Sequence, residues 1–204
     1  MGTDAYGWVE IKDEFGWTPL IQAWPLMSRN YDLFGSLFWT NRSNFRPIAQ
    51  KRGMPGDCSL QVKRDFAELV ASSSHIPGHP EEYFGCTWIT WREIQAIDWE
   101  EEAEVEPYRV WVSETLEGGK RWKSKGAYQR SWLAQKLSLS EEALDAAWNN
   151  GQIWEVDGKE YEAVKAIKRK DALSESWQTL FKLMEVLAEK YGADGVRLVV
   201  WFVS

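Results

Sequence analysis

Two segments of the chain combine side chains that could bind or transform an anionic ligand. Residues 29–34 read RNYDLF, and residues 52–57 read RGMPGD. Their two guanidinium groups could clamp a carboxylate or a phosphate through paired hydrogen bonds. An amide could orient such a ligand, and Asp4, Asp32 or Asp57 could accept a proton as a general base. The candidate ligand-binding residues are Asp4, Tyr6, Arg29, Asn30, Arg52, Asp57 and Trp88.

The same side chains have structural roles open to them. Arg29 could pair with Asp32 or Asp57, Asn30 could cap a helix, and residues 53–55 could simply form a rigid turn. Ligand site, catalytic site and scaffold therefore all stay open as interpretations of the two segments.

No complete catalytic motif accompanies these residues. The chain has no serine elbow motif and no phosphate-binding GxxxxGK[ST] or GxGxxG loop, and neither Cys58 nor Cys86 has a neighbouring base in the sequence. His75 and His79 lie in a Pro/Gly-rich loop, where they make a poor metal pair. We predict no catalytic residue, no metal and no cofactor, and we lean towards a protein that is not an enzyme.

Composition narrows the class of partner. The 204 residues, 44% of them hydrophobic, suit one compact domain or one domain with an insertion. There are 24 basic and 31 acidic side chains, a net charge of −7, which argues against diffuse binding to a polyanion and favours a basic protein surface. The 14 tryptophans predict a Trp-rich core, with a stacking surface for bases or sugars as the alternative.

The expected compartment is the cytoplasm. Two cysteines without CxxC spacing fit a reducing environment. No apolar run approaches the length of a membrane span, and the first residues lack the pattern of a signal peptide.

Hydrophobic periodicity predicts the elements that must position the candidate residues. Residues 6–20 alternate around a Gly turn, as in a β-hairpin whose second strand Pro19 places at an edge. Helices are expected over residues 30–39 and after Asp57 or Ser59, and Thr90-Trp91-Arg92-Glu93 is a capping box. The buried side of the second helix is predicted to contain Leu60, Phe66, Leu69 and Val70. A helix ending at Tyr191-Gly192 precedes residues 196–202, an apolar run typical of a central strand buried on both faces.

The middle of the chain has a different pattern. A strand is expected at 108–112, helices at 128–137 and up to residue 148, and a hairpin at 153–164 around Asp157-Gly158. Helix, turn, helix and wing resemble a winged-helix unit, whose second helix would enter a nucleic-acid groove. That helix carries three carboxylates and no cation, which favours contact with a protein or a purely structural role. The basic stretch from Lys120 to Lys136 leaves nucleic-acid binding open as an alternative. The candidate contact residues are Lys120, Arg121, Lys123, Lys125, Arg130 and Trp148.

Several motifs together resemble a family of uncharacterised phage and bacterial proteins. They are the GTD and GWVE segments near the N-terminus, RNYDLF, RGMPGD, TWIT at 87–90 and the strand VRLVVWF. The family has no assigned chemistry, so the resemblance implies a fold and a phage context only. Where relatives tend to carry histidine, this chain has Tyr6 and, before the TWIT segment, Phe84-Gly85-Cys86. Any family chemistry that used those histidines is expected to be lost here.

We therefore predict an α+β fold, with an antiparallel or mixed sheet covered by helices and a winged-helix-like inserted subdomain. Residues 1–106 and 171–204 would form the main domain, and residues 107–170 the insertion. The predicted function is a phage-encoded inhibitor that docks on a host defence protein in the host cytoplasm. The alternatives are a sponge for a nucleotide-like ligand, using arginine and tryptophan side chains, and a nucleic-acid binder that uses the insertion.

Overall fold

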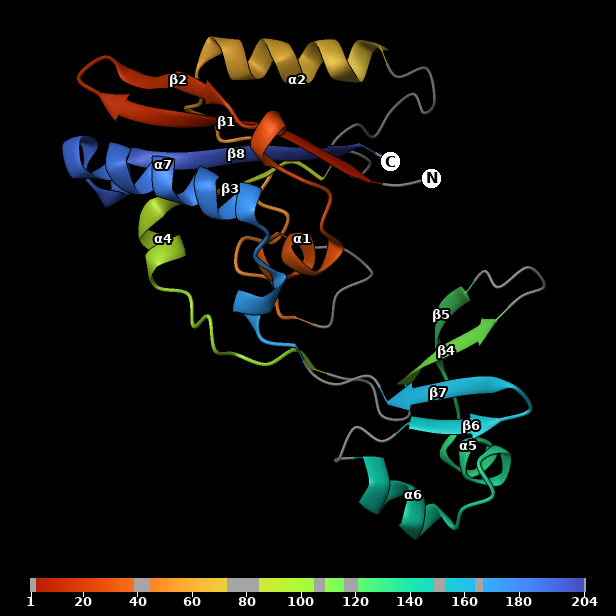
Figure 1. Cartoon of the computed structure of the whole chain (residues 1–204). Helices are drawn as coiled ribbons and strands as arrows, with labels where there is room; N and C mark the ends of the chain where they lie inside the picture. The colour runs from red at the N-terminus through yellow and green to blue at the C-terminus, as the bar shows by residue number, and fades with distance from the viewer. Residues whose placement is uncertain are drawn as a thin grey trace. The chain divides into compact units, whose positions relative to one another are not determined.

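The computed structural model describes residues 3–38, 45–72, 85–104, 109–115, 121–148, 153–163 and 167–203. The chain divides into two compact units (Figure 1). One unit combines residues 1–101 with residues 168–204, and the other comprises residues 102–167. Each contains a four-stranded antiparallel sheet with helices, so the predicted mixture of antiparallel sheet and helices is confirmed.

The first unit has a sheet in the order β2-β1-β8-β3. β1 (Asp4–Asp13) and β2 (Gly16–Gln22) form the predicted hairpin, while β8 (Val196–Val203) pairs with β1 and β3 (Thr87–Thr90) pairs with β8. β2 lies at an edge, as Pro19 predicts, because proline lacks the N–H that an inner strand must donate. The two ends of the first unit's sequence thus meet in the middle of one sheet.

Helices cover both faces of this sheet (Figure 1). α1 (Tyr31–Leu37), α4 (Trp91–Gln95) and α7 (Glu175–Tyr191) pack on one face, and α2 (Leu60–Ser72) packs on the other. Alternate residues of β8 enter the two cores: Leu198 and Val200 face α7, whereas Val199 and Trp201 face α2. Because both alternating sets are buried, β8 is apolar along almost its whole length, and its predicted central place is confirmed.

Local signals explain where these helices begin. The Asn30 side chain accepts a hydrogen bond from the Leu33 N–H at 3.1 Å, which caps α1. Thr90 and Glu93 form the predicted capping box of α4. The prediction for α2 was wrong at Leu60, which is 71% exposed, while Val62 is fully buried. Two residues along a helix turn the side chain by about 200°, so a helix that buries Val62 must expose Leu60.

The second unit has a sheet in the order β5-β4-β7-β6. β4 (Arg109–Thr115) pairs with both β5 (Arg121–Ala127) and β7 (Lys159–Ala163), and β6 (Ile153–Val156) completes the second hairpin. α5 (Arg130–Lys136) and α6 (Glu141–Trp148) connect the two hairpins. Asp157 and Gly158 both have positive φ, 52° and 73°, as a type I′ turn requires. β5 was not predicted, and it turns an expected single strand into a hairpin.

Arg169 explains why the first unit resumes at residue 168. Its guanidinium is 1% exposed and donates to the carbonyls of Ser36 (2.5 Å) and Arg46 (2.6 Å) and to the Glu101 carboxylate (3.0 and 3.1 Å). The predicted boundary at residue 170 assigned this arginine to the insertion. Its contacts place it in the first unit, where it fixes the point at which the chain returns.

Candidate functional site

The sheet face beneath α2 carries a cluster of charged and aromatic side chains. Strand register pairs Arg197 of β8 with Glu10 of β1 on one side and with Thr90 of β3 on the other. Paired positions on neighbouring strands point to the same face, so the Glu10 and Arg197 side chains meet. Trp17 of β2 and Trp88 of β3 come from the two edge strands and contact the same guanidinium.

Arg197 is the centre of this cluster. Its Nε donates to Glu10 Oε2 at 2.9 Å, and its Nη1 donates to Asp57 Oδ1 at 2.8 Å. The arginine is 2% exposed and Glu10 is fully buried, and the second Glu10 oxygen accepts from the Ser59 N–H at 2.8 Å. The two buried charges therefore bind each other, and Asp57 and Ser59 in the segment before α2 bind Arg197 and Glu10, respectively. Within the described part of the chain, the buried Arg197 Nη2 has no hydrogen-bond partner.

One aromatic ring, Trp88, contacts both arginines of the site, and Trp17 contacts Arg197 alone. The Arg197 guanidinium carbon lies 3.7 Å from the centroid of the Trp17 ring and 5.8 Å from that of Trp88. The guanidinium carbon of Arg52 lies 5.0 Å from the Trp88 centroid. We call Trp17, Arg197, Trp88 and Arg52 the arginine–tryptophan ladder. Each cation lies within the distance at which the ring quadrupole attracts it.

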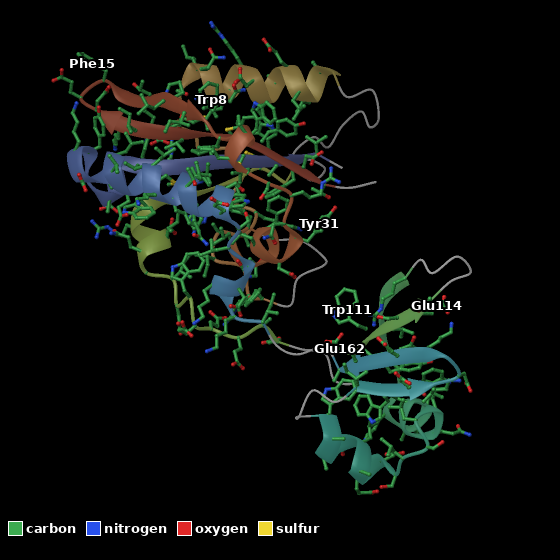
Figure 2. The ribbon with its side chains drawn as sticks, viewed as in Figure 1. Trp8, Phe15, Tyr31, Trp111, Glu114 and Glu162 are labelled. Carbon is green, nitrogen blue, oxygen red and sulfur yellow. The ribbon has the colours of Figure 1, made fainter. Side chains whose placement is uncertain are left out.

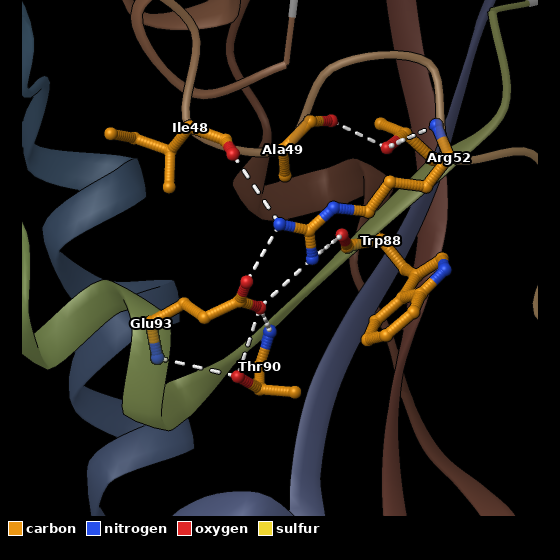
Figure 3. Close-up of polar contacts among 7 residues, drawn as sticks. Ile48, Ala49, Arg52, Trp88, Thr90 and Glu93 are labelled. Carbon is orange, nitrogen blue, oxygen red and sulfur yellow. Dashed lines mark hydrogen bonds and ion pairs between the residues drawn. The ribbon is translucent and has the colours of Figure 1, made fainter.

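Arg52 is also held by several hydrogen bonds (Figure 3). Its two terminal nitrogens bind both oxygens of Glu93, at 3.0 and 2.6 Å, and they also donate to the carbonyls of Trp88 (3.2 Å) and Ile48 (3.3 Å). Glu93 in turn accepts from the N–H and the hydroxyl of Thr90. One arginine thus joins the loop before α2 to the start of α4.

Two acids of the site, Glu93 and Asp57, have lowered pKa values. Burial would raise the pKa of Glu93, but hydrogen bonds from Arg52 and Thr90 outweigh it and lower the pKa below its ordinary value. The Arg197 hydrogen bond, with help from the Trp17 indole N–H, lowers the pKa of Asp57. Neither carboxylate has the raised pKa that suits a general base at neutral pH.

Cys58 lies beside this cluster and is no better as a nucleophile. Burial, followed by the negative charge of Glu10, raises the pKa of the Cys58 thiol. A thiol that stays protonated is unreactive, because the thiolate is the attacking species. The geometry therefore supports a structural role for this cysteine.

The candidate residues of the N-terminal half separate into different places. Arg52, Asp57 and Trp88 belong to one cluster, joined through Arg197. Arg29 pairs with Asp4 (Nη2 to Oδ1, 2.7 Å) and not with Asp32 or Asp57, the partners suggested by sequence. Both members of that ion pair are about half exposed.

Asn30 and Tyr6 have their own surroundings. Asn30 caps α1 and donates its amide to the Ala172 carbonyl at 2.5 Å, so both ends of its side chain are used. Tyr6 lies on the α2 face of β1 and lines a cavity of about 500 Å³. Asp4 and Asp57 lie at opposite ends of β1, because Asp57 is tied to the Glu10 end; six residues of strand span about 20 Å. A catalytic centre made of Asp4, Arg29 and Asp57 is not assembled.

Sequence reasoning missed the residues that hold the cluster together. Glu10 and Arg197 are 187 positions apart. Arg197 is the single charged residue of β8, whereas Glu10 lies in the buried part of β1, whose other charged residues are at or next to the strand ends. A single charged residue inside a buried strand was the available signal, since such a charge requires a partner. Glu93 was identified as a cap, but its ion pair with Arg52 has no local sequence signal.

The cations of the second unit are also neutralised where the structure describes them. Arg121 binds Glu160, Arg130 binds Glu141 (2.5 Å) and Asp145, and Lys136 binds Asp157. Lys120 lies outside the described residues, and of Lys123 and Lys125 only the strand backbone is described. Trp148 stacks on Trp154 with ring centroids 6.1 Å apart. The predicted contact residues therefore do not form a described basic patch.

No group of three or more His, Cys, Asp or Glu side chains within the described residues is arranged to hold a metal ion. None of the helices in the described part of the chain has the length and apolar character that crossing a bilayer requires. A scan of protein-family models and searches of curated proteins and of solved structures found nothing that matches this chain.

Proposed function

We propose that this chain is a non-enzymatic binding protein that acts by docking on another protein. The observation that carries the proposal is that Arg52 and Arg197 are bound by carboxylates of the same chain. An anionic substrate would have to displace Glu93, which also accepts from the N–H and hydroxyl of Thr90, or Glu10, which also accepts from the N–H of Ser59. The ladder is thus better suited to stabilise a surface than to bind a substrate.

Net charge favours a basic partner. The chain carries seven more acidic than basic groups, and opposite charge on two proteins speeds their encounter and disfavours wrong partners. The motif resemblance to phage and bacterial proteins supports a phage-encoded inhibitor with a host protein, such as a defence protein, as its target in the host cytoplasm. Inhibition by docking requires no reactive group on the inhibitor.

Two alternatives have weaker support. A sponge for a nucleotide-like ligand would need free guanidinium groups near Trp88, and Arg52 is already held by Glu93. A nucleic-acid binder would use the insertion as a winged-helix unit. Its two helices and hairpin support this idea, but the acidic partners of Arg121 and Arg130 weaken attraction to phosphate.

Capture of a partner tests the proposal. The immobilised chain is incubated with nuclease-treated bacterial lysate, and bound protein is eluted, identified and mixed again with the chain in purified form. The proposal predicts one protein that forms a stoichiometric complex, measured by light scattering after gel filtration. Absence of a stoichiometric protein partner across host lysates, together with a saturable response to a nucleotide, would favour the sponge instead.

A further inference from the structure

A second feature of the α2 face lies apart from the ladder. A cavity of about 500 Å³ separates part of α2 from the hairpin. Four aromatic rings and two carboxylates line it: Tyr6, Trp8, Trp24, Trp201, Asp65 and Glu68. Its volume lies in the range of sites that hold small ligands or single side chains. Trp8, which Figure 2 labels between the hairpin and α2, is one of the lining residues.

The sequence places these groups together through simple periodicities. Tyr6 and Trp8 are two apart on β1 and so share a face, and Trp201 of β8 is paired with Tyr6. Asp65 and Glu68 are three apart on α2, which puts both carboxylates on one side of the helix. Trp24 begins a short 3₁₀ helix (Trp24–Leu26) after β2 and is 52% exposed. The cavity therefore opens to solvent beside a tryptophan.

Among the described residues, the carboxylates of the cavity differ from those of the ladder in having no cationic partner. Asp65 accepts hydrogen bonds from the Trp8 indole N–H (2.7 Å) and the Gln61 amide (2.6 Å), and both donors are neutral. In the part of the chain that the structure describes, neither Asp65 nor Glu68 forms an ion pair, and no cation lies over the rings of Trp8 or Trp24. Within the described ranges, two carboxylates thus lie beside aromatic faces without a paired cation.

Aromatic faces and carboxylates attract the same kind of ligand. The face of an indole or phenol ring is the negative end of its quadrupole, and it binds ammonium groups within about 6 Å. A carboxylate adds direct attraction and repels phosphates and carboxylates. A polar anion is thus excluded, and a neutral apolar ligand would leave the charge of Asp65 without a counterion.

We propose that this cavity binds a cationic alkylammonium group, which is either a lysine side chain of the docked protein or a small quaternary amine. The inference deepens the proposed function and rests on it for the lysine source. In both cases the rings of Trp8 and Trp24 contact the ammonium group and its alkyl carbons, and Asp65 and Glu68 add direct attraction to its charge.

Titration of the whole chain with matched probes tests this site. Choline is compared with its neutral isostere 3,3-dimethylbutanol, and N-acetyl-lysine methylamide with the norleucine analogue. The readout is the indole N–H signal of Trp8 in a nitrogen–proton correlation spectrum, assigned by its loss in Trp8→Phe. We expect saturable shifts with the cations only. A stronger response to choline indicates a free amine, and one to the lysine probe indicates a protein side chain.

Matched variants separate binding from folding. Asp65→Asn keeps an acceptor for the Trp8 N–H, and Trp24→Ala removes an exposed ring; each should weaken cation binding by about threefold or more. Glu189→Gln on α7 and Phe15→Ala at the hairpin tip are exposed and remote from the cavity lining, and should leave it unchanged. If neither cation causes a response, or if the neutral isosteres cause equal shifts, the inference is overturned. A stoichiometric protein partner found despite that result would leave the proposed function standing.

Discussion

The Arg197 guanidinium donates to the Glu10 carboxylate at 2.9 Å across the β1–β8 pair, and both side chains are buried. Glu10 comes from the first hairpin and Arg197 from the last strand, so this ion pair joins the two ends of the first unit's sequence. Asp57 and Ser59 extend it to the segment that begins α2. Asp57, which the sequence suggested as a ligand-binding residue, thus helps to hold α2 on the sheet of the first unit.

Removing one member of this pair should destabilise the fold strongly. Arg197→Met leaves Glu10 buried with one backbone donor, and breaking a buried pair typically costs about 3–5 kcal/mol. Urea unfolding followed by tryptophan fluorescence measures the loss. The matched control is Arg92→Met, which breaks the exposed Arg92–Asp194 pair and should destabilise the fold far less than Arg197→Met. Equal effects of the two substitutions would contradict this account of Arg197.

Glu93 should make the free energy of unfolding depend on pH at acidic pH. Its folded pKa is below the ordinary value of 4.5, so its contribution is complete above that value and is lost as the pH falls through the folded pKa. The free energy of unfolding of the wild type and of Glu93→Gln is measured from about pH 7 to about pH 3. The wild type should be the more stable at neutral pH, and the gap should narrow below about pH 4.5. If the difference in free energy of unfolding between the two proteins were constant over this range, the ionisation of Glu93 would not contribute to stability.

Gly7 should tolerate no side chain. It pairs with Val200 in the β1–β8 ladder, and an added Cβ would lie 2.1 Å from the Val199 carbonyl oxygen. Since the obstacle is backbone, Gly7→Ala should cost about 3 kcal/mol or more. Gly56→Ala is the control, because nothing lies within 4 Å of its added Cβ, and it should change stability by less than about 1 kcal/mol. Thermal unfolding of both variants measures the difference.

The insertion should not bind nucleic acid in a salt-dependent manner. Its described cations Arg121, Arg130 and Lys136 are paired with acids, which leaves little positive field for phosphate. Gel-shift assays with single- and double-stranded DNA and RNA at low salt provide the measurement. A shift that weakens when Lys123 and Lys125 are replaced by glutamine would instead support the nucleic-acid alternative.

Local sequence patterns predicted most of the helices and strands. The others depend on contacts between residues that are far apart in the sequence. The hairpin of β1 and β2, the Asn30 cap, the Thr90–Glu93 box and the apolar strand β8 each follow from a few neighbouring residues. β5 has a basic sequence with weak alternation, and it becomes a strand by pairing with β4. Its formation is a tertiary effect that propensity does not encode.

The candidate site was predictable only in part, for a related reason. Arginines, acids and tryptophan were recognised by type, but their partners depend on strand register. Arg52 could be chosen from its own segment, whereas its partner Glu93 is 41 residues away and Arg197 is 187 residues from Glu10. The cavity beside Trp8 requires β1, β8 and α2 together, and no single segment of the sequence indicates it.

We propose that the chain binds a protein through the cavity lined by Trp8, Trp24, Asp65 and Glu68, while Arg52 and Arg197 stabilise the fold. The most direct measurement is the dissociation constant between the captured partner and three forms of the chain: wild type, Glu68→Lys and Glu189→Lys. Both variants reverse one exposed charge, but only Glu68 lines the cavity. The account predicts that Glu68→Lys weakens binding about tenfold or more and that Glu189→Lys leaves it within about twofold. Equal affinity of all three forms would contradict it.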